Sequence, residues 1–257
     1  MLIGDGCYDI YHYGSVTRIS PEAPVPVFDH KYSKRKFGMA LNVKENLTAL
    51  GMNEYTDIHI YAYPMEEKNR YLHEKTNQQL FRVDNKITQS DDLFFIMKMV
   101  ELFIKDVDCV VISDYDKGTL SLNDIVKIIS LAKEHDIPVF IDTKKKDYAF
   151  FSGAFVKINE KEYMERNSRC ENMIVTRADK SVEYYFTYID DEYLNFPVNS
   201  IGFHDVTGAG DTFLASLAFM YMLTKDIEMS IRFAIKASQV SIQHYGCYAP
   251  KLEEILE

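Results

Sequence analysis

The sequence predicts an α/β fold in which a mostly parallel central sheet is flanked by helices, and three observations support this. Short apolar runs typical of buried strands alternate with helical patterns over the C-terminal two-thirds of the chain. Strands that alternate with helices pair through right-handed crossovers and build parallel sheets covered on both faces. A proline-rich segment near the start departs from this pattern and indicates a separate extended element.

That segment comprises residues 10–36, where Pro21, Pro24 and Pro26 alternate with small and β-branched residues. Proline cannot donate to a ladder of backbone hydrogen bonds, so such a segment lies at a sheet edge or in an extended connection. We expect residues 10–36 to be part of a small β lid on a single domain that comprises residues 1–257. A plain surface loop is the alternative.

Helices and strands then follow in alternation. A helix is expected after Ser90, and another begins at a capping box formed by Ser121 and Asp124. Two further helices are expected after Asp211 and Asp226, and the second is expected to stop at Gly246. The expected buried strands cover residues 109–113, 138–141, 155–158 and 173–175.

Composition argues against several function classes. The 257 residues carry a formal net charge of -10, and general nucleic-acid binding requires clustered Lys and Arg instead. The four cysteines are far apart and the histidines show no HxH or HExxH spacing, so neither a disulfide framework nor a protein-built transition-metal site is expected. The lack of a long apolar stretch and of a secretory signal predicts a cytoplasmic protein with no membrane partner.

Polar side chains follow each of the predicted strands. Because the carboxyl ends of parallel strands meet at one edge of a sheet, we expect these side chains to form an active site there. Polar loop exits without a function are the alternative. The residues concerned are Asp114, Asp142, Lys144, Asn159, Glu162, Thr176 and Arg177.

The most informative stretch is residues 205–211, a glycine-rich turn that leads into an apolar helix. Gly208 and Gly210 allow a tight turn and a close approach to a ligand. The free N–H groups at the helix start would bind phosphate oxygens, aided by the helix dipole. Asp211 would then lie beside a transferring phosphoryl group and accept a proton from the attacking hydroxyl. A functionally silent helix N-cap is the alternative.

This stretch, Asp205-Val206-Thr207-Gly208-Ala209-Gly210-Asp211, resembles the DTxGAGD signature of the ribokinase (PfkB) carbohydrate kinases, and the resemblance extends over nearly the whole chain. Within the family it is most similar to kinases of D-glycero-D-manno-heptose 7-phosphate, the kinase domain of ADP-heptose synthases, in shortened form. The segments that carry this similarity are residues 15–27, 78–84, 113–118 and 142–144.

The resemblance implies a ribokinase-like fold and an ATP-dependent kinase that phosphorylates a sugar or sugar phosphate, with Asp211 as its base. The amides of Gly208, Ala209 and Gly210 would form the anion hole. The implied cofactors are ATP and Mg²⁺, and a homodimer through the lid is the implied assembly. ATP-binding positions would be Lys144, Asn159, Glu162, Thr176, Gly208 and Gly210, with Asn159 and Glu162 also organising Mg²⁺ indirectly. Substrate-binding positions would be Asp9, Arg18, Gly38, Asn42, Lys68 and Arg70.

Basic residues outside the motifs have two interpretations. Lys68 and Arg70 lie on a candidate lid or edge strand, where they would meet the phosphate of an acceptor or simply be solvated. The densest basic cluster covers residues 31–36 and is expected to be a solvated lid loop, with a role in binding a sugar phosphate or ATP as the alternative.

Three features depart from the family pattern. Phe37 replaces a glycine of the GGxxN substrate motif, which predicts occlusion or altered specificity. The connection after Gly51 is shorter by about one strand–helix–strand unit, and both glycines of the VTxGxxG pattern are replaced, at Ala178 and Ser181. Two hypotheses therefore stand: a trimmed but active kinase, or a degenerate relative that acts as a nucleotide- or sugar-binding or regulatory subunit.

Overall fold

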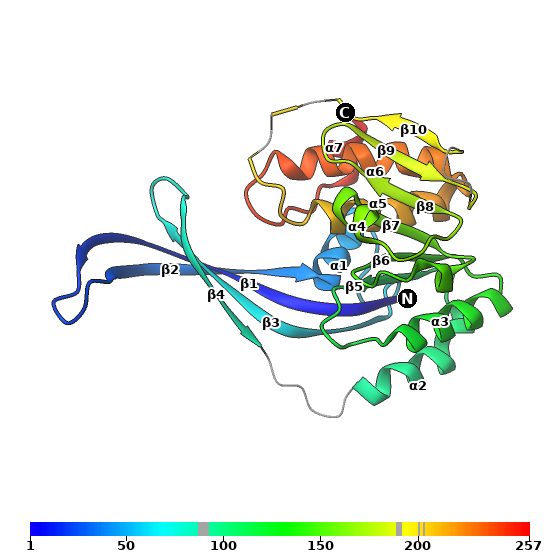
Figure 1. The fold of residues 1–257 in the computed structure, drawn as a ribbon, viewed down its shortest axis with the longest axis horizontal. Coiled ribbons are helices and arrows are strands. Elements are labelled where there is room, and N and C mark those ends of the chain that lie inside the picture. The colour runs from blue at the N-terminus through cyan, green and yellow to red at the C-terminus, as the bar shows by residue number, and fades with distance from the viewer. Residues whose placement is uncertain (87–92, 189–191, 200, 203) are drawn as a thin grey trace.

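The fold is built around one large sheet, with its strands in the order β10-β9-β8-β7-β6-β5-β1-β3-β4 and β2 paired to β1 (Figure 1). The computed structural model describes residues 1–86, 93–188, 192–199, 201–202 and 204–257. Strands β1 and β5 to β8 run parallel, while β2, β4, β9 and β10 are antiparallel to their neighbours. This is the α/β class that the alternation of strands and helices predicts.

The element bounds are as follows. The strands are β1 (Leu2–Ile19), β2 (Pro26–Met39), β3 (Ile60–His73), β4 (Gln79–Lys86), β5 (Val110–Asp114), β6 (Val139–Thr143), β7 (Phe155–Asn159), β8 (Met173–Thr176), β9 (Ser181–Tyr185) and β10 (Leu194–Pro197). The α-helices are α1 (Ala40–Ala49), α2 (Leu93–Phe103), α3 (Leu122–Glu134), α4 (Glu160–Glu165), α5 (Ala209–Thr224), α6 (Ile227–Ile242) and α7 (Leu252–Leu256). Short 3₁₀ helices cover Ile104–Asp106 and Tyr148–Phe151.

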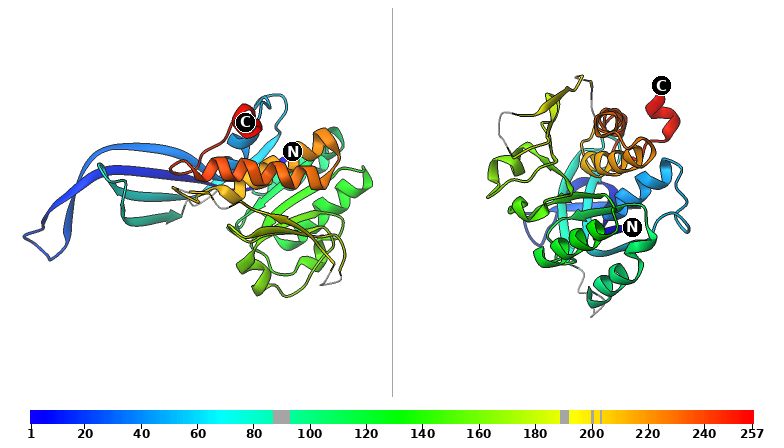
Figure 2. Two further views of the ribbon diagram at one scale, coloured as in Figure 1. Left: turned by 90° about the horizontal axis from the view of Figure 1, so that it is seen from above. Right: turned by 90° about the vertical axis from the view of Figure 1, so that its right-hand side faces the viewer.

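Helices cover both faces of the sheet, so the core is divided into two layers (Figures 1 and 2). Successive side chains of a strand point to opposite faces. In β5, Val110 and Ile112 join the layer under α2 and α3, whereas Val111 joins the layer under α1, α5 and α6. Because both faces are buried, these strands appear in the sequence as continuous apolar runs, which is the pattern that identified them.

Most of the predicted elements are confirmed. Ser121 accepts a hydrogen bond from the Asp124 amide and Asp124 accepts one from the Ser121 amide, so the capping box at the start of α3 is present. The predicted Ser90 helix start lies outside the described residues. The predicted stop at Gly246 is wrong: α6 ends at Ile242. Gly246 takes a positive φ of 67° in the following loop, where its amide donates to Asp205.

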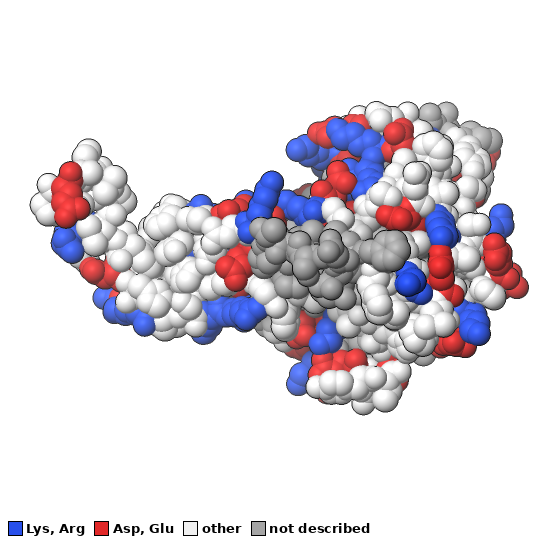
Figure 3. Space-filling view, turned by 90° about the horizontal axis from the view of Figure 1, so that it is seen from below, with Lys and Arg blue, Asp and Glu red and all other residues white. Residues whose placement is uncertain are grey.

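Strand β1 leaves the core sheet and continues into a long projection. Only Leu2, Ile3 and Gly4 pair with β5, whereas pairing with β3 continues to Gly14 and pairing with β2 continues to Ile19. We call the projection, formed by residues 6–39 and 66–86, the arm. It extends far from the helices (Figures 1 and 2), and many of its Lys and Arg side chains are on the surface (Figure 3).

The short connection after α1 leads directly into β3. This strand pairs with β1 from Ile60 to His73 and so passes from the core into the arm without interruption. Strand β4 pairs only with residues 66–72 of β3, which leaves the first part of β3 as an edge of the core sheet. A cavity of about 250 Å³ lies beside this region, between Leu47, Ile58 and Phe219.

None of the helices in the described part of the chain has the length and the apolar character that a membrane crossing requires.

Candidate active site

Asp211 lies in the first turn of α5, at the edge where the parallel strands end, and its side chain is buried. Two neutral donors hold the carboxylate. The side-chain amide of Asn42, on α1, donates to Oδ2 at 3.0 Å, and the hydroxyl of Tyr115, just after β5, donates to Oδ1 at 2.9 Å. The two carboxylate oxygens each keep a lone pair for another donor.

The glycine-rich turn brings this carboxylate into place. Gly208 has a φ of 83°, and a Cβ at this position would lie 2.7 Å from Nδ2 of Asn42. A Cβ on Gly210 would lie 2.8 Å from Nζ of Lys157. Any larger side chain at either position would push apart the groups that surround Asp211.

The amides of this turn differ in what they contact. The Ala209 amide donates to the carbonyl oxygen of Val206 at 3.3 Å, and the Thr212 amide donates to Gly208 at 2.9 Å. Within the described part of the chain the amides of Gly210 and Asp211 have no acceptor. They sit at the positive end of the α5 dipole, where an anion is favoured.

A chain of charges with alternating sign runs along the strand ends next to Asp211. Nζ of Lys157 contacts Oδ2 of Asp142 at 2.6 Å, and Oδ1 of Asp142 lies 3.7 Å from Nζ of Lys144. Lys144 in turn forms an ion pair with Glu162. Burial alone would lower the pKa of Lys144, but the carboxylates of Asp142 and Glu162 raise it. Lys144 therefore carries its charge at the edge where a phosphate would sit.

Lys157 is a site residue that sequence reasoning missed. The sequence feature that could have identified it is a single lysine inside the otherwise apolar run of β7, and the structure shows that this lysine is only 4% exposed. A buried ammonium needs a charged partner, and Asp142 was already a candidate.

Asn159 and Glu162 form a reciprocal capping box at the start of α4. Asn159 Oδ1 accepts from the Glu162 amide and Glu162 Oε2 accepts from the Asn159 amide, each at 2.9 Å. The box fixes the rotamer of Glu162 and leaves its other oxygen on Lys144. The predicted residues Lys144, Asn159 and Glu162 are thus brought together.

A second group of predicted residues gathers on one face of the arm where it joins the core. Arg70 Nε contacts Asp9 Oδ1 at 2.9 Å, and a Cβ on Gly38 would lie 2.6 Å from Oδ2 of Asp9. Lys68 Nζ lies 3.2 Å from Glu66 Oε1 and 5.9 Å from the centre of the Tyr115 ring.

Two members of the basic cluster, Lys36 and Lys34, lie on this face, opposite Asp9 and Tyr11 of β1. Lys36 donates to the carbonyl oxygens of Tyr245, at 3.2 Å, and Cys247, at 2.7 Å, next to the turn at Gly208. Arg35 lies on the opposite face, where it stacks 3.3 Å above the Tyr8 ring, and Lys31 pairs with Glu74 farther along the arm.

Phe37 does not cover Asp9, so the predicted occlusion is wrong. The GGxxN spacing that ends at Asn42 places its two glycines at Gly38 and Met39, and the residue that replaces a glycine is Met39, which takes a positive φ of 59°. Phe37 is paired with Tyr8 in the β1–β2 register, and the two rings are 5.9 Å apart. Asp9 is the next residue along β1 and points to the opposite face, because side chains alternate along a strand.

Some predicted positions lie apart from this site. Arg18 is exposed near the tip of the β1–β2 hairpin, opposite Val27. Asp114 accepts from Thr143 and pairs with Lys145, and Arg177 pairs with Glu183 at 2.7 Å. These contacts of Asp114 and Arg177 link neighbouring strands and loops at the edge of the sheet.

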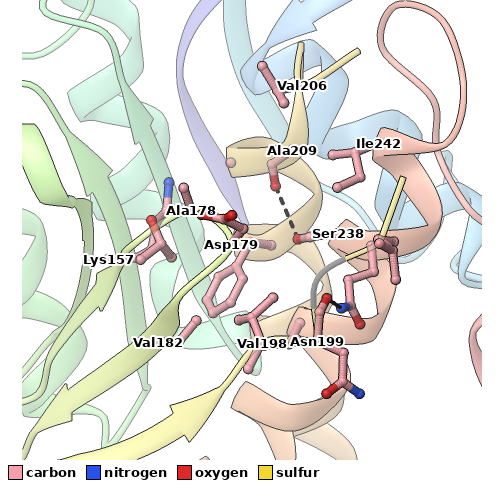
Figure 4. A pocket seen from close by; sticks show the side chains of 16 residues that line it. Lys157, Ala178, Asp179, Val182, Val198, Asn199, Val206, Ala209, Ser238 and Ile242 are labelled. Atoms are coloured by element: carbon pink, nitrogen blue, oxygen red, sulfur yellow. Dashed lines mark hydrogen bonds between the residues drawn. The ribbon is translucent and has the colours of Figure 1, made fainter. Parts of the chain in front are cut away.

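A cavity of about 510 Å³ opens beside Gly210 and Lys157 (Figure 4). Thr176 lines it at the strand edge, and the apolar side chains of Val182 and Val198 face Ile242 of α6 across it. Such a largely apolar space next to a cation and free amides suits a flat base attached to phosphates.

One residue in the wall of this cavity, Ala178, has the left-handed backbone conformation that usually requires glycine. Ala178 occupies the first replaced glycine position and has a φ of 52°. This left-handed conformation costs an alanine roughly 1 kcal/mol or more. The turn after β8 therefore retains its shape at an energetic cost.

The electrostatic state of Asp211 suits proton transfer. Burial is the main cause that raises its pKa to about 6, and the nearby Asp142 carboxylate acts in the same direction. The hydrogen bonds from Asn42 and Tyr115 and the charge of Lys157 oppose this rise. A carboxylate with a pKa close to neutral both accepts and releases a proton readily.

Comparisons with known proteins identify similar sequences. Residues 158–255 match the pfkB family of carbohydrate kinases. The bifunctional protein HldE of Sulfurimonas denitrificans is 29% identical over 305 residues, and that of Campylobacter curvus is 32% identical over 302 residues. Each alignment covers 100% of this chain but only 63% and 64% of the relative, so the chain spans less than two thirds of their length.

Solved structures show the fold. Phosphofructokinase-2 of Escherichia coli superposes with a TM-score of 0.72 at 14% identity, covering 99% of this chain and 96% of that one. Ribokinase of Arabidopsis thaliana, complexed with ribose and ATP, superposes with a TM-score of 0.68 at 15% identity, covering 99% and 96%. The fold is ribokinase-like.

We predict that Asp211 makes the stability of the protein depend on pH. Its folded-state pKa of about 6 exceeds the ordinary value of 3.8, so its ionisation destabilises the folded state as pH rises through this window. The free energy of unfolding should fall by up to about 3 kcal/mol from this group between pH 4 and pH 7. Asp211→Asn should lack this contribution. Urea unfolding of both proteins across the range measures it, and a pH-independent difference would contradict the prediction.

We predict that Ala178→Gly stabilises the protein by about 0.5–1 kcal/mol, because glycine adopts the left-handed conformation without strain. Ala149→Gly, at an exposed position in the 3₁₀ helix, is the matched control and should be destabilising. Urea midpoints of the two variants provide the measurement. Equal losses in both would mean that the backbone at Ala178 is not strained.

Proposed function

We propose that this chain, whose residues 158–255 match the pfkB family of carbohydrate kinases, transfers the γ-phosphate of ATP to a hydroxyl group of a sugar or sugar phosphate. The observation that carries the proposal is the buried Asp211 carboxylate, which lies beside free helix amides and follows Gly210, a residue that lines a base-sized cavity. These are the parts that phosphoryl transfer needs: a base, an anion site and a nucleotide pocket.

In the proposed reaction Asp211 accepts the proton of the acceptor hydroxyl. The hydroxyl oxygen forms a bond to the γ-phosphorus as the bond between that phosphorus and the β,γ-bridging oxygen breaks, and ADP leaves. Charge spreads over the γ-phosphate oxygens during transfer, and the amides of Gly210 and Asp211 would stabilise it. Lys157 and Lys144 would add two fixed positive charges on the same side.

The nucleotide would bind with its base in the cavity and its phosphates at the start of α5. Val182 and Val198 would pack against the base, and Thr176 would lie near the phosphates (Figure 4). Lys144 would also contact the phosphates, since Asp142 and Glu162 hold it at the strand edge.

Magnesium would enter with the nucleotide. The described residues hold no cluster of three or more His, Cys, Asp or Glu side chains that would bind a metal alone. Asn159 and Glu162 are engaged in their capping box, which suits an indirect role through water. Mg²⁺ commonly keeps several waters and neutralises phosphate charge when it binds with a nucleotide.

The acceptor side favours a sugar that already carries a phosphate. Lys36, Lys68 and Arg70 lie on the same face of the arm as Asp9 and Glu66, so these three cations outnumber the two carboxylates there. In this proposal Asp9 and Asn42 contact sugar hydroxyls and the lysines contact the acceptor phosphate. The resemblance of residues 15–27 to heptose 7-phosphate kinases makes that compound the first acceptor to test.

We further propose that the arm acts as the lid of the kinase and pairs two copies of the chain. Its outer surface exposes the apolar side chains of Ile19, Val25, Tyr32, Phe81 and Val83, and apolar surface on a projecting sheet favours association. Arg18 would then take part in the interface or the partner's site. A cytoplasmic location is part of the proposal, since the substrate is ATP and the four cysteines are free.

We predict acceptor-dependent release of ADP by the purified protein with Mg-ATP. Heptose 7-phosphate and a panel of other sugars and sugar phosphates would be tested, with Asp211→Asn as the control. Loss of the base should lower turnover by about 100-fold or more. Turnover equal to that of Asp211→Asn for every acceptor, by a folded protein that binds ATP, would instead support a degenerate binding or regulatory subunit.

We predict that Lys68→Met raises the KM for a phosphorylated acceptor by about 10-fold or more, because a charge-assisted contact is worth roughly 1.5–3 kcal/mol. The KM for the same sugar without its phosphate should change little. Arg35→Met, on the opposite face of the arm, is the matched control. Equal effects of Lys68→Met on both acceptors would contradict the assignment of the phosphate to this face.

A further inference from the structure

The hydroxyl of Tyr115 donates to the Asp211 carboxylate, and neither the glycine-rich turn nor the substrate motif accounts for this contact. We propose that Tyr115 is a positioning residue that orients the Asp211 carboxylate for proton transfer. This inference rests on the proposed kinase function and adds a residue to its machinery. The geometry that supports it lies in the loop that carries Tyr115, in the charges around its ring and in the pair of donors on the carboxylate.

The loop of Tyr115 is anchored by a buried carboxylate. Asp5, on β1, is fully buried, and it accepts hydrogen bonds from the amides of Tyr115 at 2.8 Å, Lys117 at 3.0 Å and Thr119 at 3.1 Å. Three backbone contacts to one side chain define the path of the loop and hence the direction of the phenol. The tyrosine is therefore placed by the fold itself and does not depend on a ligand.

The ring of Tyr115 lies between the two halves of the site. Nζ of Lys144, on the nucleotide side, is 5.1 Å from the ring centre, and Nζ of Lys68, on the acceptor side, is 5.9 Å from it. Cations close to an aromatic ring are attracted to it. These contacts restrict the ring further and place the hydroxyl where the two substrates would meet.

The phenol and the Asn42 amide bind different oxygens of Asp211. Two donors on two oxygens restrict rotation of the carboxylate and leave a lone pair free for an acceptor hydroxyl. Both donors also stabilise the ionised form, which is the form that acts as a base. Without the phenol, the carboxylate would be held less firmly, by the Asn42 amide, and more of it would be protonated at neutral pH.

Other groups also influence the ionisation of Asp211. Asp142 on β6 raises its pKa and Lys157 on β7 lowers it, while Lys144 and the Cys247 thiol face it from the loops after β6 and α6. Tyr115→Phe leaves all four in place. A change in the pKa of Asp211 in that variant would therefore report the lost phenol.

The test measures Tyr115→Phe in two independent ways. The first is the pH profile of kcat with a saturating acceptor. We expect kcat to fall by about 10-fold and the acidic limb to move to higher pH by about one unit, because a hydrogen bond to a charged group is worth roughly 1.5–3 kcal/mol. The KM for ATP should change by less than about 3-fold.

The second measurement is the pKa of Asp211 from the carboxyl ¹³C NMR titration of the aspartates, assigned with Asp211→Asn. It needs no turnover, so it separates this inference from the proposed function. Tyr184→Phe is the matched control, because its hydroxyl donates to Asn172 at the other end of the strands. This control should leave both the profile and the titration unchanged.

A raised pKa of Asp211 in Tyr115→Phe, together with the shifted acidic limb, supports the role of Tyr115. If the wild-type protein phosphorylates no acceptor, the kinase proposal fails while the titration still tests the contact. An unchanged pKa and an unchanged kcat profile in Tyr115→Phe would overturn the inference even in an active kinase.

Discussion

The candidate site depends on the continuity of strand β1 from the core into the arm. The first residues of β1 pair with β5, and the rest pair with β2 and β3. The same strand carries Asp5, which anchors the loop of Tyr115, and Asp9, which faces the cationic side of the arm. The two halves of the site are thus linked by one hydrogen-bonded element, and supporting residues on rigid elements hold a site more accurately than residues on loops do.

Strand β1 approaches its neighbour β5 closely at the point where it leaves the core sheet. Gly4 lies where the two strands separate, and a Cβ there would come within 1.9 Å of the carbonyl oxygen of Ser113. Only glycine fits at this position, because the backbone of β5 lies too close for any side chain. The loop that follows Ser113 can then pass close enough to donate its amides to Asp5.

Burial of charge explains the chemistry of the site. The buried Asp142 and Lys157 pair with each other, as buried charges must if they are to remain ionised, and the partly buried Lys144 pairs with Asp142 and Glu162. Asp211 differs, because its hydrogen-bond partners are the neutral groups of Asn42 and Tyr115. Its pKa of about 6 follows from this difference. The same environment that costs stability leaves one carboxylate able to exchange a proton near neutral pH.

The sequence by itself determined the alternation of strands and helices, the capping box at Ser121 and the glycine-rich turn before Asp211, because each depends on residues close together in the chain. It did not place the end of α6, since the loop at Gly246 is held by the distant Asp205. Tertiary structure alone decided that Lys157, Lys36 and Tyr115 reach the site and that Phe37 faces away from it. Those outcomes depend on strand register and on contacts between distant segments, and neither is encoded in local periodicity.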